Sequence, residues 1–191
     1  MTRVVNLLFI ADTIGQMVMN GVSMSNQWDL VNGRGSTGTE YGLLWVDKNF
    51  QRAPQYYALH LWSQFGSSLL LVASNVSAAS TLSVYAGRRS TTVITVFAIN
   101  KAGAPVTARV SLQGAVAVSA VANTAVGASL TDQTVTFNNV PDAQIKDDLS
   151  NAPAIRVPIS GASFAYSFAS NSVTLLVITV KAQSDSLPTF A

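Results

Sequence analysis

Asn20-Gly21-Val22-Ser23-Met24-Ser25-Asn26-Gln27-Trp28 opens the stretch, residues 20–66, that decides the fold class of this chain. Polarity roughly alternates from Val22 to Trp28, which predicts a short strand that ends in an aromatic side chain. A glycine-rich loop follows. Pro54 then fits the first position of a helix over residues 54–65, and Gly66 fits its left-handed cap. Strand, loop and helix in this order predict one β/α unit of a parallel α/β fold.

Residues 1–20 allow two interpretations. Arg3 followed by an apolar run could mark a secretory signal, but the run is short and Asp12 interrupts it. A helix closed by Asn20-Gly21 is the better interpretation, because apolar residues recur on one face of it. That apolar stripe consists of Val4, Leu7, Leu8, Ala11, Ile14 and Val18.

From Leu69 onward, apolar residues no longer recur at the three- and four-residue spacing of a helix. They recur at every second residue, as in a β-strand. Eight segments read as strands, separated by Gly, Asn, Pro and Ser: residues 69–73, 82–88, 91–100, 106–112, 116–121, 134–137, 164–168 and 172–180. Antiparallel strands without intervening helices predict a β-sandwich. Segments 91–100 and 172–180 are apolar enough to be central. The polar stretch 141–158 contains Asp142, Lys146, Asp147 and Asp148 and is predicted to be a surface loop.

The composition limits the partners of the chain. Of its 191 residues 49% are hydrophobic and 10% are charged, the net charge is +2, and cysteine is absent. Charges spread without runs attract neither nucleic acid nor an anionic membrane, so we expect neither as a partner. The absence of cysteine removes disulfides and thiolate metal sites. We predict no metal site and no cofactor.

Several of these motifs occur in the order found in one enzyme group. The motifs are Asn20-Gly21-Val22, Asn26-Gln27-Trp28-Asp29-Leu30, Tyr41-Gly42-Leu43-Leu44, Arg52-Ala53-Pro54-Gln55-Tyr56-Tyr57-Ala58-Leu59, Phe65-Gly66, Ile99-Asn100-Lys101 and Phe164-Ala165-Tyr166-Ser167-Phe168. This order resembles the C-terminal part of a clan A glycoside hydrolase, of the α-L-arabinofuranosidase, β-xylosidase or endoglucanase type. The resemblance implies a mainly β fold: a remnant of a TIM barrel (helix, strand, loop, helix) in residues 1–68, then an antiparallel β-sandwich of about eight strands in residues 69–191.

The chain departs from the pattern of that family at the catalytic residues. Retaining glycosidases use two carboxyl groups about 5–5.5 Å apart, and the resemblance places both glutamates before the part that this chain matches. The single glutamate, Glu40, matches neither position. What the resemblance does imply is a sugar platform at Trp28, where the family's eighth strand offers an aromatic ring. Asn26 and Trp45 are further candidates for sugar contact.

Other residue patterns have simpler interpretations. Gly33-Arg34-Gly35-Ser36-Thr37-Gly38 has the spacing of a nucleotide loop, but no helix opens after it. His60 is the only histidine and lacks a serine-nucleophile motif, so we expect it on a half-solvated helix face beside Tyr56 and Gln64. Asp29 with Glu40, or the acids of 141–158, could form an acid pair or an oxygen-ligand site, but most such acids lie on surfaces.

Two functions follow, with a structural domain that binds no ligand as a third possibility. The first is a non-catalytic carbohydrate-associated module that binds a plant-type polysaccharide or oligosaccharide or supports a missing catalytic half. The alternative is a self-sufficient glycoside hydrolase that uses Glu40 and Asp29. Because the stripe of the first helix would lack cover, we also expect a homo-oligomer through residues 1–66. Secretion as part of a longer enzyme is the localisation we consider.

Overall fold

The computed structural model describes residues 2–33, 41–70, 81–159 and 161–182. Its helices and 3-10 turns are α1 Val4–Met19, η1 Val46–Lys48, α2 Pro54–Trp62 and η2 Asp142–Gln144. Its strands are β1 Val31–Asn32, β2 Leu44–Trp45, β3 Gln51–Arg52, β4 Ser68–Leu70, β5 Leu82–Ser90, β6 Val93–Asn100, β7 Val106–Ser111, β8 Ala115–Val126, β9 Thr136–Phe137, β10 Val140–Pro141, β11 Ile155–Arg156, β12 Ser163–Phe168 and β13 Ser172–Ala182.

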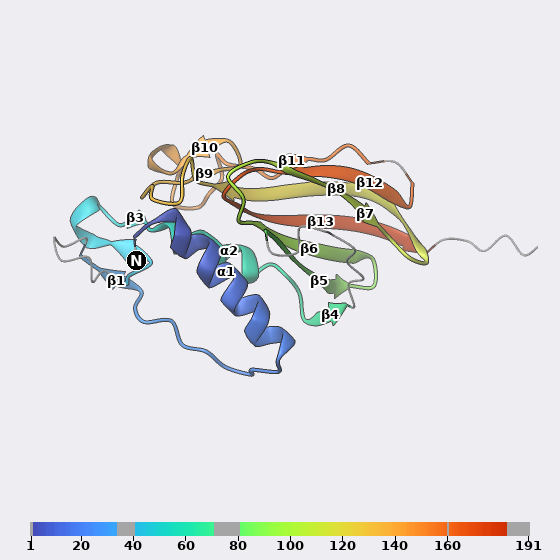
Figure 1. The fold of residues 1–191 in the computed structure, drawn as a ribbon, viewed down its shortest axis with the longest axis horizontal. Coiled ribbons are helices and arrows are strands. Elements are labelled where there is room, and N and C mark those ends of the chain that lie inside the picture. The colour runs from blue at the N-terminus through green and yellow to red at the C-terminus, as the bar shows by residue number, and fades with distance from the viewer. Residues whose placement is uncertain (1, 34–40, 71–80, 160, 183–191) are drawn as a thin grey trace, which may run out of the picture.

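The long strands form one large antiparallel sheet (Figure 1). Its strand order is β10-β9-β8-β13-β6-β5-β4, and β11 pairs with β8. β6 and β13 are central and pair from Asn100–Ser172 to Val93–Thr179. A second sheet consists of β7 and β12, which pair antiparallel along their whole length. The predicted sandwich and its eight strands are therefore confirmed, although residues 71–73 of the first strand lie outside the described residues.

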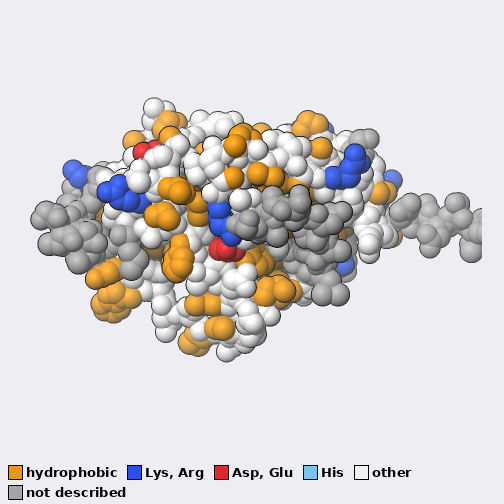
Figure 2. Space-filling view, viewed as in Figure 1, with side chains coloured by type: hydrophobic (Ala, Val, Ile, Leu, Met, Phe, Trp, Pro, Cys, Tyr) orange, Lys and Arg blue, Asp and Glu red, His pale blue; other side chains and the backbone are white. Residues whose placement is uncertain are grey.

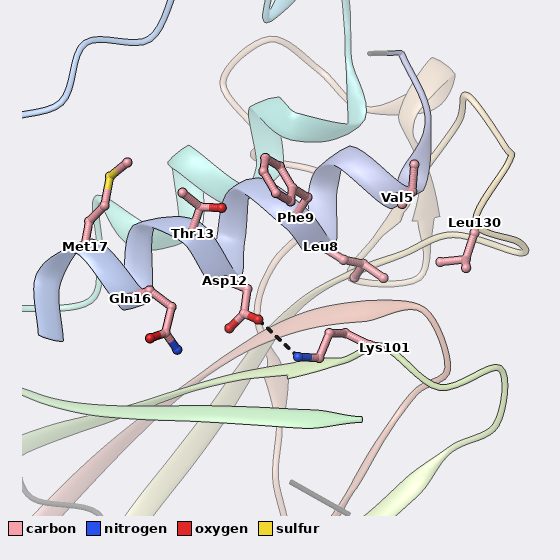
Figure 3. A pocket seen from close by; sticks show the side chains of 9 residues that line it. All are labelled: Val5, Leu8, Phe9, Asp12, Thr13, Gln16, Met17, Lys101 and Leu130. Atoms are coloured by element: carbon pink, nitrogen blue, oxygen red, sulfur yellow. Dashed lines mark hydrogen bonds and ion pairs between the residues drawn. The ribbon is translucent and has the colours of Figure 1, made fainter. Parts of the chain in front are cut away.

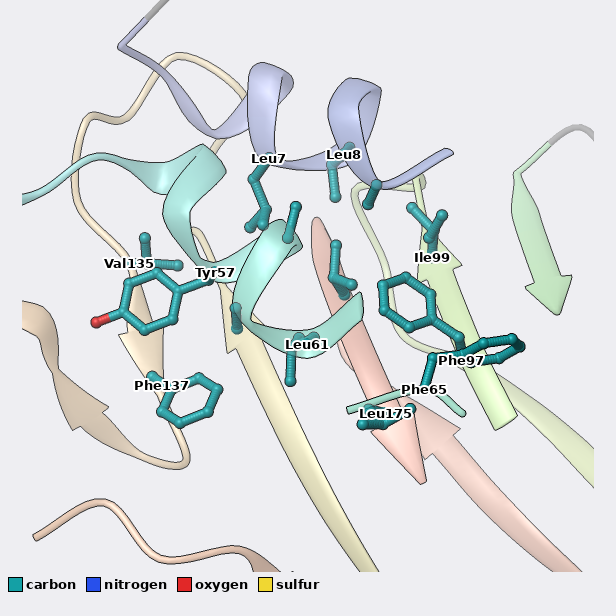
Figure 4. Packing of buried hydrophobic residues seen from close by; sticks show 14 of the residues in the cluster. Leu7, Leu8, Tyr57, Leu61, Phe65, Phe97, Ile99, Val135, Phe137 and Leu175 are labelled. Atoms are coloured by element: carbon teal, nitrogen blue, oxygen red, sulfur yellow. The ribbon is translucent and has the colours of Figure 1, made fainter. Parts of the chain in front are cut away.

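The two central strands bury side chains on both faces of the large sheet. In β6, Phe97 and Ile99 join a core with the helices, whereas Val96 and Ala98 join a second core beneath β7 and β12. Figure 4 shows Leu7 and Leu8 of α1 and Leu61 of α2 packed over Phe97 and Leu175. Successive side chains of a strand point to opposite faces, so each central strand contributes to both cores. The result is three layers: the helices, the large sheet, and the two-stranded sheet of β7 and β12.

Helix α1 docks on the sandwich of its own chain. The amides of Val4 and Val5 donate to the carbonyls of Asp132 and Leu130 at 2.8 and 3.0 Å, which satisfies two donors of the first turn. Gly15 faces Tyr85 so closely that an added Cβ would lie 2.2 Å from its ring. A glycine inside this helix is thus explained by close contact with the sheet.

The apolar stripe of α1 is the first correction to the sequence analysis. Its residues Val4, Leu7, Leu8 and Ala11 are buried within the chain, Ile14 is half-buried and Val18 is exposed. The prediction that this stripe would lack cover is wrong, because α2 and the large sheet cover most of it. The homo-oligomer through residues 1–66 stays a prediction, but it can no longer rest on that stripe.

Exposed apolar side chains gather instead on other parts of the N-terminal segment. Eleven of the fifteen exposed large hydrophobic residues in the described ranges fall between residues 5 and 50: Val5, Phe9, Val18, Met19, Val22, Met24, Trp28, Leu30, Val31, Val46 and Phe50. Figure 2 shows such side chains scattered over one face of the molecule, with few charged ones between them. Within the described ranges, α1 and α2 are both too short or too polar to cross a membrane.

Candidate functional site

Three short strands near the N-terminal end of the molecule carry the candidate site. β1 pairs parallel with β2, and β2 pairs antiparallel with β3 through Leu44–Arg52 and Trp45–Gln51. The turn η1 connects β2 to β3, so these two strands form a hairpin. Trp45 is completely buried, and it anchors the hairpin to the interior. We call these three strands the small parallel-edged sheet.

Arg52 fixes this small parallel-edged sheet to the sandwich. Its guanidinium nitrogen Nη1 lies 3.5 Å from Oδ1 of Asp142, and Nη2 donates to the carbonyl of Lys146 at 2.9 Å. The hydroxyl of Tyr57 donates to the same Asp142 oxygen at 2.5 Å. Burial, followed by this hydrogen bond, raises the pKa of Tyr57. Asp142 was predicted to lie on a surface loop, and that is wrong, because only 2% of its side chain is accessible.

Trp28 lies three residues before β1 of the small parallel-edged sheet, and 77% of its surface is exposed. Its peptide bond to Asp29 is cis. The backbone that follows is fixed, because the amide of Leu43 donates to the carbonyls of Asp29 and Leu30 at 3.2 and 3.1 Å. An exposed indole on a fixed backbone can stack on the apolar face of a sugar ring.

The strand predicted over residues 22–28 does not form. These residues are exposed and carry no strand assignment. Alternating polarity there matches a strand, but a strand also needs a neighbour to accept and donate its backbone hydrogen bonds. The described residues supply such a neighbour only from Val31 onward, where β1 meets β2.

The two other predicted sugar contacts have opposite outcomes. Asn26 is exposed in the segment before Trp28 and is free to meet a ligand. Trp45 is completely buried, so its role as a second platform is wrong. The aromatic side chain that the hairpin does expose is Phe50, which the sequence analysis did not consider. The sequence feature that could have identified Phe50 is its position directly after Asn49 and just before β3.

Asp29 is the one member of the predicted acid pair that the structure places. It is half-buried, and its Oδ2 accepts a hydrogen bond of 3.3 Å from the side-chain amide Nδ2 of Asn32. Its Oδ1 and the Oε1 of the buried Gln55 are enclosed, and neither accepts a hydrogen bond from the described residues. Glu40 and the glycine-rich residues 34–38 lie outside the described residues. The pair of Glu40 with Asp29 is therefore a hypothesis that the structure leaves untested.

His60 has structural contacts, in agreement with the sequence analysis. Its ring is half-buried, stacks on Tyr56 with centroids 6.1 Å apart, and meets Phe137 edge-on at 5.7 Å. The amide nitrogen of Gln64 lies 2.9 Å from its Nε2. Burial, followed by the positive charge of Arg52, lowers the pKa of His60. A neutral imidazole packed in this way needs no catalytic role to explain it.

A groove of about 460 Å³ lies where α1 meets Lys101 and Leu130 of the sandwich (Figure 3). Its lining is mainly apolar, with Phe9 and Leu130 at its sides and the ion pair between Asp12 and Lys101, 3.1 Å long, at its base. Burial raises the pKa of Asp12, but hydrogen bonds from Tyr85, Lys101 and Ser83 outweigh it and hold this pKa below its ordinary value. These polar groups satisfy one another, so the groove offers a ligand few free partners.

No protein-family model matches the chain, and no curated protein does. Solved structures match its fold. An arabinose-bound α-L-arabinofuranosidase has a TM-score of 0.69 at 16% identity, over 94% of this chain and 28% of that one. The α-L-arabinofuranosidase of Thermotoga maritima has a TM-score of 0.63 at 16% identity, over 91% and 38%. A bifunctional glucanase-xylanase from a metagenome library has a TM-score of 0.62 at 19% identity, over 94% and 29%.

The chain therefore spans less than two fifths of the length of these structures. They are clan A glycoside hydrolases, and the match corresponds to a C-terminal region of such an enzyme. At these low identities the likeness concerns the fold. It confirms the resemblance found in the sequence, including the α/β segment followed by the sandwich.

Proposed function

We propose that the chain is a carbohydrate-associated module that binds a plant-type polysaccharide or oligosaccharide on Trp28. The observation that carries this proposal is the indole of Trp28, 77% exposed, next to the half-buried carboxylate of Asp29. Sugar rings present an apolar face to aromatic rings and hydroxyl groups to carboxylate and amide oxygens. Trp28 supplies the first kind of contact, and the exposed Asn26 can supply the second.

The fold of the neighbours supports the choice of carbohydrate over other ligands. Each of the three solved structures is named for a carbohydrate that it acts on or binds. Their activity is not carried over, because this chain covers only a minor part of each of them. A role in polysaccharide degradation would then be auxiliary, with Trp28 holding the sugar chain.

Replacement of Trp28 by alanine tests the proposal. We expect the variant to lose about 1–3 kcal/mol of binding free energy on insoluble arabinoxylan, because it loses one aromatic contact. Depletion of protein from solution by increasing amounts of the polysaccharide measures the change. Met24→Ala is the matched control, since Met24 is also 77% exposed and belongs to the same segment. Equal retention of Trp28→Ala and wild type would contradict the role of Trp28.

The hydrolase alternative predicts a different result. If the chain is a binding module, adding it should not raise the hydrolysis rate of arabinoxylan, xylan, carboxymethylcellulose or aryl glycosides above the rate in buffer alone. Reducing-sugar and chromogenic assays measure this directly. Turnover that disappears in Glu40→Gln and persists in Asp148→Asn would establish the alternative, with Glu40 and Asp29 as the acid pair. Asp148 is the matched control because it is an exposed acid of the loop 141–158.

A further inference from the structure

Helix α1 has apolar side chains on the face that points away from the large sheet as well as on the face that packs against it. Of its 16 residues only Asp12 is charged, and Asp12 is paired with Lys101. A helix that is apolar on all sides is normally buried on all sides. Within the described ranges, however, α2 and the large sheet cover the inward face alone.

The outward face of α1 carries one row of side chains at intervals of four residues, which places them on the same side of the helix. This outward row consists of Val5, Phe9, Thr13 and Met17. Figure 3 shows it on the side of the helix away from the strands. Val5 is 45% and Phe9 is 63% exposed. The outward row contains no charge, so it suits the apolar surface of a partner.

Residues 22–30 follow α1 almost directly and lack a neighbouring strand. Exposed apolar side chains occupy alternate positions except 26, as on one face of a strand: Val22, Met24, Trp28 and Leu30. Residues 23–28 make no backbone–backbone hydrogen bond to another described residue. Exposed strand edges usually carry a charged residue or a proline that prevents pairing, but residues 22–28 contain neither. This segment can therefore pair with a strand of another polypeptide.

A β/α polypeptide can cover both surfaces at once. In a β-α-β unit the helix packs over the two parallel strands that it connects. A partner strand beside residues 22–30 would take the place of the first of these strands and bring apolar side chains against the outward row. The matched structures point to such a partner, because this chain corresponds to a C-terminal region of them and further polypeptide precedes that region. The resemblance found in the sequence makes that polypeptide the β/α units of a TIM barrel.

We propose that the outward row of α1 and residues 22–30 form one docking surface for the β/α part of a TIM barrel, and that a strand of this partner pairs with residues 22–30. A second copy of the chain is the competing occupant. It is less suited, because its own residues 22–30 belong to no sheet among the described residues that would hold them extended. The inference goes beyond the proposed function, since it does not require Trp28 to bind sugar.

Co-expression of the full chain with a tagged β/α polypeptide tests the inference. The probe is the part of the Thermotoga maritima α-L-arabinofuranosidase that precedes its matched region. We expect wild type to co-purify with the probe. Phe9→Asp puts a charge into the outward row, and Ser25→Pro removes a backbone amide from the pairing segment, so each should lower the recovered complex about tenfold or more. Both residues are exposed, so the free variants should unfold at the temperature of wild type.

Two control variants and a second readout make the test specific. Ser25→Ala keeps the backbone amide, and Val118→Asp puts the same charge on an exposed apolar residue of β8, so both should co-purify as wild type does. Amide hydrogen exchange should slow about tenfold or more over residues 22–30 in the complex. Loss of the complex in Phe9→Asp and Ser25→Pro, with this protection in wild type, supports the inference.

Three results would overturn it. The first is that wild type forms no complex with the probe. The second is a complex that Phe9→Asp or Ser25→Pro leaves intact, because the part of the surface tested by that variant is then not in contact. The third is self-association of wild type alone, measured by sedimentation and abolished by Phe9→Asp, which would make a second copy the occupant. None of these results involves sugar binding, so the proposed function stands or falls separately.

Discussion

Replacing Asp142 by alanine should lower the free energy of unfolding by about 3–5 kcal/mol, the range found when one partner of a buried ion pair is removed. Only 2% of the Asp142 side chain and 9% of the Arg52 side chain are accessible. Without Asp142, the guanidinium of Arg52 stays buried with backbone carbonyls as its remaining buried acceptors. The hydroxyl of Tyr57 also loses its acceptor. Chemical denaturation followed by circular dichroism measures the change.

Two further variants make this test specific. Asp147 also lies near Arg52, at 3.8 Å, but its side chain is fully exposed, so Asp147→Ala should leave stability unchanged within experimental error. The double variant Arg52→Met, Asp142→Leu should recover much of the loss, because an apolar pair leaves no buried charge. A small effect of Asp142→Ala would contradict the buried network. The tyrosine absorbance titration adds a local readout, since the pKa of Tyr57 should fall when its partner carboxylate is removed.

Replacing Phe97 by alanine should also lower the free energy of unfolding by about 3–5 kcal/mol. Phe97 is completely buried in β6, and its ring stacks on Trp62 of α2 with centroids 4.1 Å apart. The same core contains residues of α1 and the side chain of Phe65. The cavity therefore opens where the helices meet the large sheet, so both parts lose packing together.

This second variant also tests whether the helices and the sandwich unfold as one unit. If they do, tryptophan fluorescence and far-ultraviolet circular dichroism should give coincident transitions, shifted to lower denaturant by the same amount. Phe9→Ala is the matched control, because Phe9 is exposed on α1 and should change stability little. An early fluorescence transition with an intact β-sheet signal would show that residues 1–68 unfold separately from residues 69–191.

The sequence determined the elements whose pattern is local. The central strands β6 and β13 are apolar at most positions, and this pattern predicted their central place because both of their faces are buried. Helix α2 was predicted from Pro54 at its start and from its apolar spacing, and the structure begins it at that residue. These patterns can be recognised in the sequence because they involve residues that are only a few positions apart.

The tertiary structure decided which of the candidate site residues are exposed and which are buried. Trp28 and Trp45 were both candidates for sugar contact, yet one is exposed and the other is completely buried. Asp142 looked like a surface acid because its buried partners, Arg52 and Tyr57, come from a distant part of the chain. Burial and pairing depend on contacts between residues that are far apart in sequence, and local composition does not contain that information. For the same reason, alternation over residues 22–28 predicted a strand but could not show that no neighbouring strand in the described ranges supplies its hydrogen bonds.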